Sequence, residues 1–189
     1  MANVKLSQRE LDLVTNADFI LTKNKIITKV YDLFGEMSDY AVKEANNFLE
    51  DEIKIISPKI SKGENYEGLP WVMLDYPRYF TEKDVFAIRT YFWWGNYFSI
   101  TLQLKGKFRN KLQVANFKLQ EKPDWYLCCN KNEWQYHFRN DNYKLLNEFS
   151  EEEIQQLSFI KLAKKIPLHQ WDDVEIFLKE TFETMLGLL

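Results

Sequence analysis

Apolar and polar residues alternate most regularly from Val85 to Leu104, on both sides of the dipeptide Gly95-Asn96. An alternation with a period of two is typical of a β-strand with one buried face. A Gly-Asn dipeptide between two such runs indicates the turn of a β-hairpin. The sequence therefore predicts a hairpin with one apolar face. In its second strand that face consists of Phe98, Ile100, Leu102 and Leu104.

The length of the hairpin loop decides which residues of the first strand share that apolar face. A two-residue loop would place Arg89 opposite Leu102, and an unpaired guanidinium on an apolar face is costly. A three-residue loop instead aligns Ile88, Phe92 and Trp94 with the apolar residues of the second strand. We therefore predict the three-residue loop. The opposite face then carries Arg89, Tyr91, Trp93, Ser99, Thr101 and Gln103.

The N-terminal part of the chain carries helix signals. Ser7 and Glu10 have the spacing of a capping box, which predicts the start of a short helix. Asn16 or Asp18 then opens a longer helix, which we expect to extend to about residue 50 and to bend or break at Gly35. Its apolar stripe recurs at steps of three, four or seven residues. The stripe consists of Ile20, Ile27, Val30, Phe34, Met37, Ala41, Ala45 and Phe48.

The segment between this helix and the hairpin contains one predicted strand. Ser57–Gly68 is polar and contains two glycines, so it predicts a loop. Trp71–Tyr76 is apolar and aromatic, which favours a strand, and Pro77 either ends that strand or confines it to a sheet edge.

Two segments follow the hairpin. Lys105–Lys122 fits either a helix or a further strand, and we favour the helix because its apolar residues recur at helical spacing. Trp125–Cys129 and Glu133–Phe138 predict a second hairpin, with its turn at residues 130–132.

The C-terminal part predicts two helices. Ser150 and Glu153 form a second capping box and open a helix toward Ile166, which Pro167 stops. Trp171–Leu186 predicts the last helix. The apolar stripe of this helix consists of Val174, Phe177, Leu178, Phe182 and Leu186.

Helices at both ends of the chain thus bracket a block of strands. This order is typical of the α+β class, in which helices pack on a face of an antiparallel sheet. We predict one domain over residues 1–189. Its single antiparallel sheet has about five or six strands and packs against the long N-terminal helix and the C-terminal helices.

Composition and charge exclude several classes of protein. The chain has 189 residues, a formal net charge of −3 and an aromatic content of 16%. An acidic chain without a known nucleic-acid-binding motif gives little reason to expect nucleic-acid binding, and no apolar run is long enough for a membrane span. The first residues lack the apolar core of a signal peptide, and Cys128 and Cys129 are adjacent and form no disulfide framework. We therefore expect a cytoplasmic protein.

Motifs for catalysis or metal binding are not found in the sequence. No glycine-rich phosphate loop or nucleophile elbow occurs, and His137 and His169 are not part of a metal-ligand pattern. In the second predicted hairpin, Cys129 and His137 lie too far apart for a cysteine–histidine pair. We expect no cofactor and no metal, and we favour a protein that is not an enzyme.

The best candidate site is the polar face of the first hairpin. Arg89, Tyr91 and Trp93 point the same way from one strand, which places a cation between aromatic rings. Asp75 and Thr101 are expected nearby, so this face could bind a small molecule or a peptide. The alternative is that a helix covers the face. An enzyme that uses Asp75 and Arg89 is a third hypothesis.

A protein partner is the second functional hypothesis. The segment from residue 145 to the C-terminus carries more carboxylates than lysines. Acidic helices of this kind attract a basic partner, as an immunity or adaptor protein would. The basic stretch at residues 105–122 could contact nucleic acid, but the overall acidity of the chain argues against this.

Overall fold

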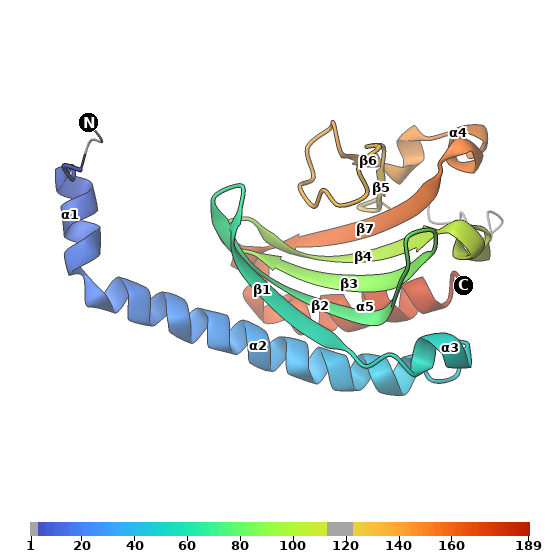
Figure 1. The fold of residues 1–189 in the computed structure, drawn as a ribbon, viewed down its shortest axis with the longest axis horizontal. Helices are drawn as coiled ribbons and strands as arrows, with labels where there is room; N and C mark the ends of the chain where they lie inside the picture. Colours follow the sequence, from blue (N-terminus) through green and yellow to red (C-terminus); the bar gives the residue numbers. More distant parts are fainter. Residues whose placement is uncertain (1–3, 113–122) are drawn as a thin grey trace.

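The structure, a computed structural model that describes residues 4–112 and 123–189, contains one seven-stranded antiparallel sheet (Figure 1). The strand order is β1-β2-β3-β4-β7-β5-β6. The predicted α+β class is therefore confirmed, with more strands than we expected. The strands are β1 (Lys59–Tyr66), β2 (Leu69–Phe80), β3 (Val85–Trp93), β4 (Tyr97–Lys105), β5 (Tyr126–Cys128), β6 (Tyr143–Leu145) and β7 (Phe159–Pro167).

The predicted central hairpin is formed by β3 and β4, and its loop has three residues. Phe92 pairs with Phe98 and Trp93 pairs with Tyr97, which leaves residues 94–96 as the loop. Gly95 has φ of 73°, a left-handed conformation that glycine adopts without a steric cost. The predicted register is confirmed. It places Phe98, Ile100, Leu102 and Leu104 in the core, each of them fully buried.

Two helices cover the apolar face of the sheet, α2 (Ala17–Ala45) and α5 (Val174–Leu186) (Figure 1). The predicted stripe of α2 supplies buried residues from Val30 onward, and the ring of Phe34 meets that of Phe98 at 6.2 Å. The buried residues of α5 include Val174, Leu178, Phe182 and Leu186, as its stripe predicted. Apolar burial on this scale is the main source of stability for helices on a sheet.

The N-terminal capping signals are confirmed, but the break at Gly35 is wrong. The short helix α1 (Gln8–Thr15) begins with the capping box of Ser7 and Glu10, and Asn16 caps α2 by accepting a hydrogen bond from the amide of Phe19. The helix α2 continues through Gly35 because glycine costs only about 1 kcal/mol in a helix, less than the packing of the stripe provides. It ends at Ala45, and a short helix α3 (Asp51–Lys54) follows.

One prediction for the region before the central hairpin is wrong, and a second is correct in one of its two alternatives. Residues 57–68 contain the edge strand β1 rather than a loop. This strand alternates charged, exposed residues such as Lys62 and Glu64 with half-buried ones, and exposed charges are typical of an edge strand. The strand β2 does not end at Pro77, because a register shift between Asp75 and Arg78 accommodates the proline. Its pairing with β1 stops at Asp75, so Pro77 itself lies where β2 has only β3 as a neighbour, in agreement with the predicted edge position.

The C-terminal capping box correctly predicted where a helix begins, but the predicted end of that helix is wrong. Ser150 caps helix α4 (Glu151–Gln156), but the chain then enters β7, between β4 and β5, instead of continuing as a helix to Ile166. A capping box determines where a helix begins and carries no information on its length. The last helix begins at Val174, after the 3₁₀ helix η4 (Leu168–Asp173), rather than at Trp171.

The second predicted hairpin is also wrong. The strand β5 pairs with β6 and with β7, not with residues 133–138. The 3₁₀ helix η3 (Leu146–Glu148) follows β6. In the segment 105–122, Lys105 ends β4 and Gly106–Lys111 forms the 3₁₀ helix η1, whereas residues 113–122 lie outside the described residues.

None of the described helices combines the length and the apolar character needed to cross a membrane.

Candidate ligand pocket at the edge of the sheet

The polar face of the sheet is not open to solvent, because residues 130–142, which we call the covering loop, lie across it. Lys161 of β7 is fully buried and donates hydrogen bonds from its ammonium to the carbonyl oxygens of Glu133, at 3.0 Å, and Gln135. The hydroxyl of Tyr97 donates to the carbonyl of Tyr136 at 3.1 Å. The expected alternative, a cover by a helix, is thus replaced by a cover of irregular chain.

The carboxylate of Glu133 provides a second attachment for the covering loop. Gln103 Nε2 donates to it at 2.9 Å, and Lys105 Nζ forms an ion pair with it at 2.5 Å. A buried carboxylate requires such partners, since an unpaired charge in the interior is very costly. Gln103, which we predicted on the polar face of the hairpin, and Lys105 at the end of β4 therefore hold the loop in place.

Arg89 is the first of the predicted site residues, and its guanidinium lies inside the fold rather than in solvent. Its side chain is 11% exposed and forms two hydrogen bonds with Asp75, at 2.7 Å from Nε and 3.3 Å from Nη2. Its Nη1 donates to the hydroxyl of Tyr136 at 2.5 Å, and its guanidinium lies 5.3 Å from the ring centre of Phe80. The charge of Arg89 is thus matched inside the fold. Asp75 and Arg89 are placed as a structural ion pair rather than as exposed groups for catalysis.

The other predicted site residues lie on the same face and are buried too. Tyr91, Trp93 and Thr101 are all at most 5% exposed. The hydroxyl of Tyr91 has no hydrogen-bond partner among the described residues, and it lies beside a cavity of about 220 Å³ walled by Tyr66 and Trp71. The structure therefore brings together all five predicted residues, and their assignment to a ligand stays a prediction.

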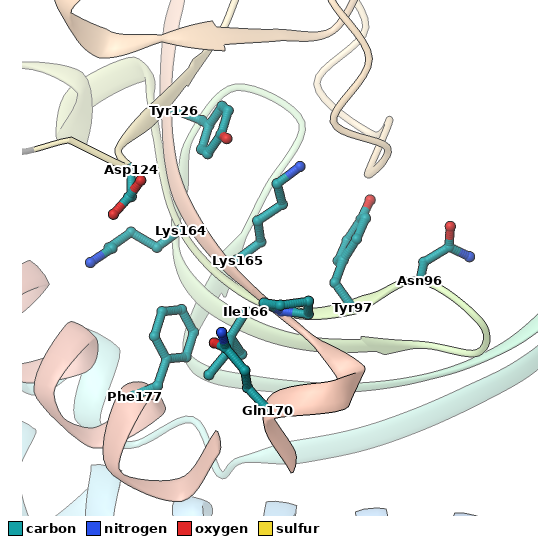
Figure 2. A pocket seen from close by; sticks show the side chains of 10 residues that line it. Asn96, Tyr97, Asp124, Tyr126, Lys164, Lys165, Ile166, Gln170 and Phe177 are labelled. Carbon is teal, nitrogen blue, oxygen red and sulfur yellow. The ribbon is translucent and has the colours of Figure 1, made fainter. Parts of the chain in front are cut away.

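A larger and more accessible pocket lies where this face ends, at the last residues of β7 (Figure 2). It has a volume of about 500 Å³. The strand β5 pairs with β7 at Leu162 and Ala163, and beyond Ala163 no strand of the described residues pairs with this side of β7. We call this cavity the lysine pocket. It is lined by Asn96, Tyr97, Asp124, Tyr126, Lys164, Lys165, Ile166, Pro167, Gln170 and Phe177.

Two consecutive lysines of β7 enter the lysine pocket from opposite faces of the sheet. Lys165 pairs with Ser99 on the polar face, and Lys164 pairs with Ile100 on the apolar face. In Figure 2, Lys165 extends between the rings of Tyr126 and Tyr97, whereas Lys164 extends toward the side of Asp124 and Phe177. The alternation of a β-strand thus places one ammonium on each side of the cavity.

Lys165 has the most distinctive surroundings. Its ammonium lies 5.6 Å from the ring centre of Tyr97, 5.1 Å from that of Tyr126 and 4.9 Å from that of Phe138. Burial lowers the pKa of Lys165. Neither it nor Lys164 forms an ion pair with a carboxylate of residues 4–112 or 123–189. The lysine pocket therefore contains a partly desolvated cation that aromatic faces stabilise and that forms no ion pair with a carboxylate of the described residues.

The tyrosines of the lysine pocket remain neutral well beyond the physiological range. Burial raises the pKa of Tyr97, and the nearby hydroxyl of Tyr66 raises it further. Burial also raises the pKa of Tyr126. Their rings are thus available for stacking, and they add no negative charge beside Lys165. The hydroxyl of Tyr97 already donates to Tyr136, so only its oxygen can accept a further hydrogen bond, whereas the hydroxyl of Tyr126 can donate and accept.

The sequence analysis did not predict that Lys164 and Lys165 belong to a site. In a helix that extends to Ile166, Lys164 and Lys165 would belong to a solvated surface. Ile160 and Leu162 are both core residues and stand two positions apart, which is the period of a β-strand. This spacing could have indicated the strand β7.

Within the described residues, no three histidine, cysteine or carboxylate side chains gather closely enough to hold a metal ion. Comparison of the chain with models of protein families, with curated proteins and with solved structures finds no match to any of them.

Proposed function

We propose that the protein binds a small anionic molecule with a planar apolar part in the lysine pocket. The observation that carries this proposal is the ammonium of Lys165, which is surrounded by three aromatic rings and lacks a carboxylate partner among the described residues. A carboxylate or phosphate group of the ligand would supply the missing negative charge. The gain is larger than at an exposed lysine because the site is partly desolvated.

The size and lining of the lysine pocket support the same class of ligand. Its volume of about 500 Å³ lies within the range of pockets that hold small molecules. Tyr126 and Phe177 supply flat apolar surface, and Gln170 and Asn96 supply polar groups that can orient a ligand. Lys164 adds a second positive charge on the other side of the cavity. The combination favours an aromatic carboxylate or a phosphorylated planar molecule over a neutral one.

A matched pair of probes tests the charge requirement. We expect isothermal titration calorimetry to detect binding of 2-naphthoate and much weaker binding of 2-naphthamide, which has the same shape but no charge. Replacing Lys165→Met should weaken 2-naphthoate binding about tenfold or more, whereas Lys165→Arg should retain it. Lys62→Met, which removes an exposed lysine of β1, is the control and should leave binding unchanged.

Two results would contradict the proposal. One is equal affinity of the wild-type protein for 2-naphthoate and 2-naphthamide, since the ammonium would then contribute nothing. The other is unchanged binding in the Lys165→Met variant with its fold intact by circular dichroism.

A second candidate ligand is an extended acidic peptide, and the open edge of β7 favours it. Beyond Ala163 this edge has no neighbouring strand among the described residues, and an added peptide strand pairs with such an edge. Lys165 would then receive an acidic side chain. A glutamate-containing peptide should gain affinity as it is lengthened and should compete with 2-naphthoate. A lack of competition would exclude this mode.

The acidic C-terminal helices provide less support for a protein partner. The apolar residues of α5 face the core, and the exposed apolar residue on this helix is Ile176. An interaction through the acidic residues alone would be steered by charge and weakened by salt. This hypothesis stays a prediction. Loss of a partner after charge reversal at Asp172, Asp173 and Glu180 would support it.

A further inference from the structure

A second cavity lies between the covering loop and the sheet, beside the edge strand β1 (Figure 1). It has a volume of about 220 Å³ and shares no lining residue with the lysine pocket. Its floor is a row across three strands, in which Ser61 pairs with Met73 and Met73 pairs with Tyr91. Asn65 of β1 also lines it and is exposed, so the cavity is nearest to solvent at the edge of the sheet. We call it the tyrosine cavity.

Aromatic rings form the walls of the tyrosine cavity. The ring of Tyr136, from the covering loop, stacks on that of Tyr91 with the ring centres 5.1 Å apart. The ring of Tyr66 meets that of Tyr91 edge to face at 6.3 Å, and the indole of Trp71 lies 6.1 Å from it. Gly63 allows Trp71 to take this place, since a Cβ atom at position 63 would lie 2.6 Å from the indole. The cavity thus presents flat apolar surfaces, which suit a planar ring.

The three tyrosines of the tyrosine cavity differ in the hydrogen bonds of their hydroxyl groups. The hydroxyl of Tyr66 donates to Gln135 Oε1 at 3.2 Å and accepts a hydrogen bond from the amide of Tyr136 at 2.9 Å. That of Tyr136 accepts a hydrogen bond from Arg89. Tyr91 is 2% exposed, and its hydroxyl has no partner among residues 4–112 and 123–189. A buried hydroxyl without a partner is unfavourable, so a hydrogen-bond acceptor in the cavity would gain by contacting it.

The charged side chain at the tyrosine cavity is Arg89, and its charge is already matched. Two hydrogen bonds join its guanidinium to the carboxylate of Asp75. Burial raises the pKa of Tyr91, so the hydroxyl of Tyr91 keeps its proton and adds no charge. A charged ligand would lose its hydration here without finding a free opposite charge among the described residues. The tyrosine cavity therefore favours a neutral ligand, in contrast to the lysine pocket.

We propose that the tyrosine cavity binds a neutral molecule of one aromatic ring that carries a hydrogen-bond acceptor, such as an aryl ketone. The rings of Tyr66, Trp71 and Tyr136 would contact the ring of the ligand. The hydroxyl of Tyr91 would donate to its acceptor. An apolar cavity of about 150 Å³ can hold benzene, so about 220 Å³ accommodates a ring with a small substituent. The inference concerns a second site and does not depend on the ligand of the lysine pocket.

A matched pair of neutral probes tests the role of the hydroxyl. Acetophenone carries a carbonyl acceptor, and isopropylbenzene has nearly the same shape without one. In isothermal titration calorimetry, Tyr91→Phe should weaken acetophenone binding about fivefold and should not weaken isopropylbenzene binding, because it removes only the hydroxyl. Tyr79→Phe is the control, since it removes a hydroxyl of β2 outside the cavity, and it should leave both affinities unchanged. Lys165→Met should also leave them unchanged, which separates this site from the lysine pocket.

The methyl group of Met73 reports where the probe binds. In NMR spectra of protein labelled at its methionine methyl groups, acetophenone should shift the Met73 signal. The signal of Met185, which is buried in α5 on the opposite face of the sheet, should stay in place. Benzoate, added to the Lys165→Met variant to avoid binding in the lysine pocket, should leave the Met73 signal unshifted because of its charge.

Three results would overturn the proposal. The first is an unshifted Met73 signal with acetophenone, which would mean that the tyrosine cavity does not admit the probe. The second is an equal effect of Tyr91→Phe on the two neutral probes, since the hydroxyl would then not contact the acceptor. The third is a shift of the Met73 signal by benzoate as large as that by acetophenone, which would contradict the preference for a neutral ligand.

Discussion

The face of the sheet beneath α2 and α5 is closed by apolar side chains, whereas on the opposite face the covering loop is held by charges and hydroxyl groups in addition to ring contacts such as that of Tyr136 with Tyr91. On the first face, Phe34 packs against Phe98 through ring contacts. On the second, Lys161 and Arg89 donate hydrogen bonds to loop atoms. Apolar packing is not directional, so many residue combinations achieve it. A buried polar contact requires particular partners at hydrogen-bond distance, so the loss of one partner leaves a buried group without a hydrogen bond.

The largest effect is expected on the apolar face. Phe98→Ala should cost about 3–5 kcal/mol of unfolding free energy, because it removes a fully buried ring and leaves a cavity. Urea denaturation followed by tryptophan fluorescence measures this loss. A cost below about 1 kcal/mol would mean that the face repacks freely.

The polar face should be nearly as sensitive at its buried ion pair. Arg89→Ala should cost about 3 kcal/mol, because it leaves the carboxylate of Asp75 buried without its partner. The double change Arg89→Met/Asp75→Leu should cost less than Arg89→Ala alone, since it removes both charges. Urea denaturation of the three proteins provides the comparison. If the double variant is the least stable, the pair stabilises the fold beyond satisfying its own charges.

The stability that the polar face contributes should depend on pH, because the buried Lys161 lies on that face. Burial lowers the pKa of Lys161 from 10.5 to about 8. Between these two values the unfolded chain keeps a proton on this lysine that the folded protein has lost. Raising the pH through this window therefore favours the folded state.

The matched variant for this test is Lys161→Met. We expect the wild-type protein to gain about 1–2 kcal/mol relative to this variant between about pH 8 and pH 9.5. The comparison removes the titration of groups that both proteins share and that Lys161 does not affect. Burial raises the pKa of Cys128 and the charge of Lys161 opposes this rise, so both proteins should carry Cys128→Ala. Parallel stability profiles for the two proteins would mean that the ammonium of Lys161 is not desolvated as its burial implies.

The smallest expected effect concerns helix α2, which covers the apolar face. A Cβ atom at Gly35 would meet no heavy atom within 4 Å, so Gly35→Ala should fit without strain. It should stabilise the protein by about 0.5–1 kcal/mol, because alanine loses less conformational freedom in a helix. Thermal unfolding followed by circular dichroism should show a rise of about 1–4 °C. A lower melting temperature would indicate that α2 needs the freedom of glycine at this position.

This difference between the faces also explains how far the sequence could predict the structure. The alternation from Val85 to Leu104, the stripe of α2 and the two capping boxes are local patterns, and each led to an element at the right place. The apolar face follows from them because apolar contacts need only the right period.

The polar face and the lysine pocket depend on pairings that no local pattern contains. Lys161 and Glu133 are 28 residues apart, and their contact exists only because β7 enters the sheet beside β4. Sequence patterns around Lys164 and Lys165 resemble the end of an exposed helix. The candidate residues Arg89 and Asp75 were correctly placed on one face, but the loop that buries them could not be predicted from local patterns.

The position of β7 also has a consequence for how the chain folds. This strand lies between β4 and β5, although more than fifty residues separate it from β4 along the chain. Until β7 has been synthesised, β4 presents a free edge on the aromatic hairpin, and such an edge can pair with other chains. Loops of this length close slowly compared with hairpins. Aggregation during synthesis should therefore depend on how soon Phe159–Pro167 pairs with the free edge of β4.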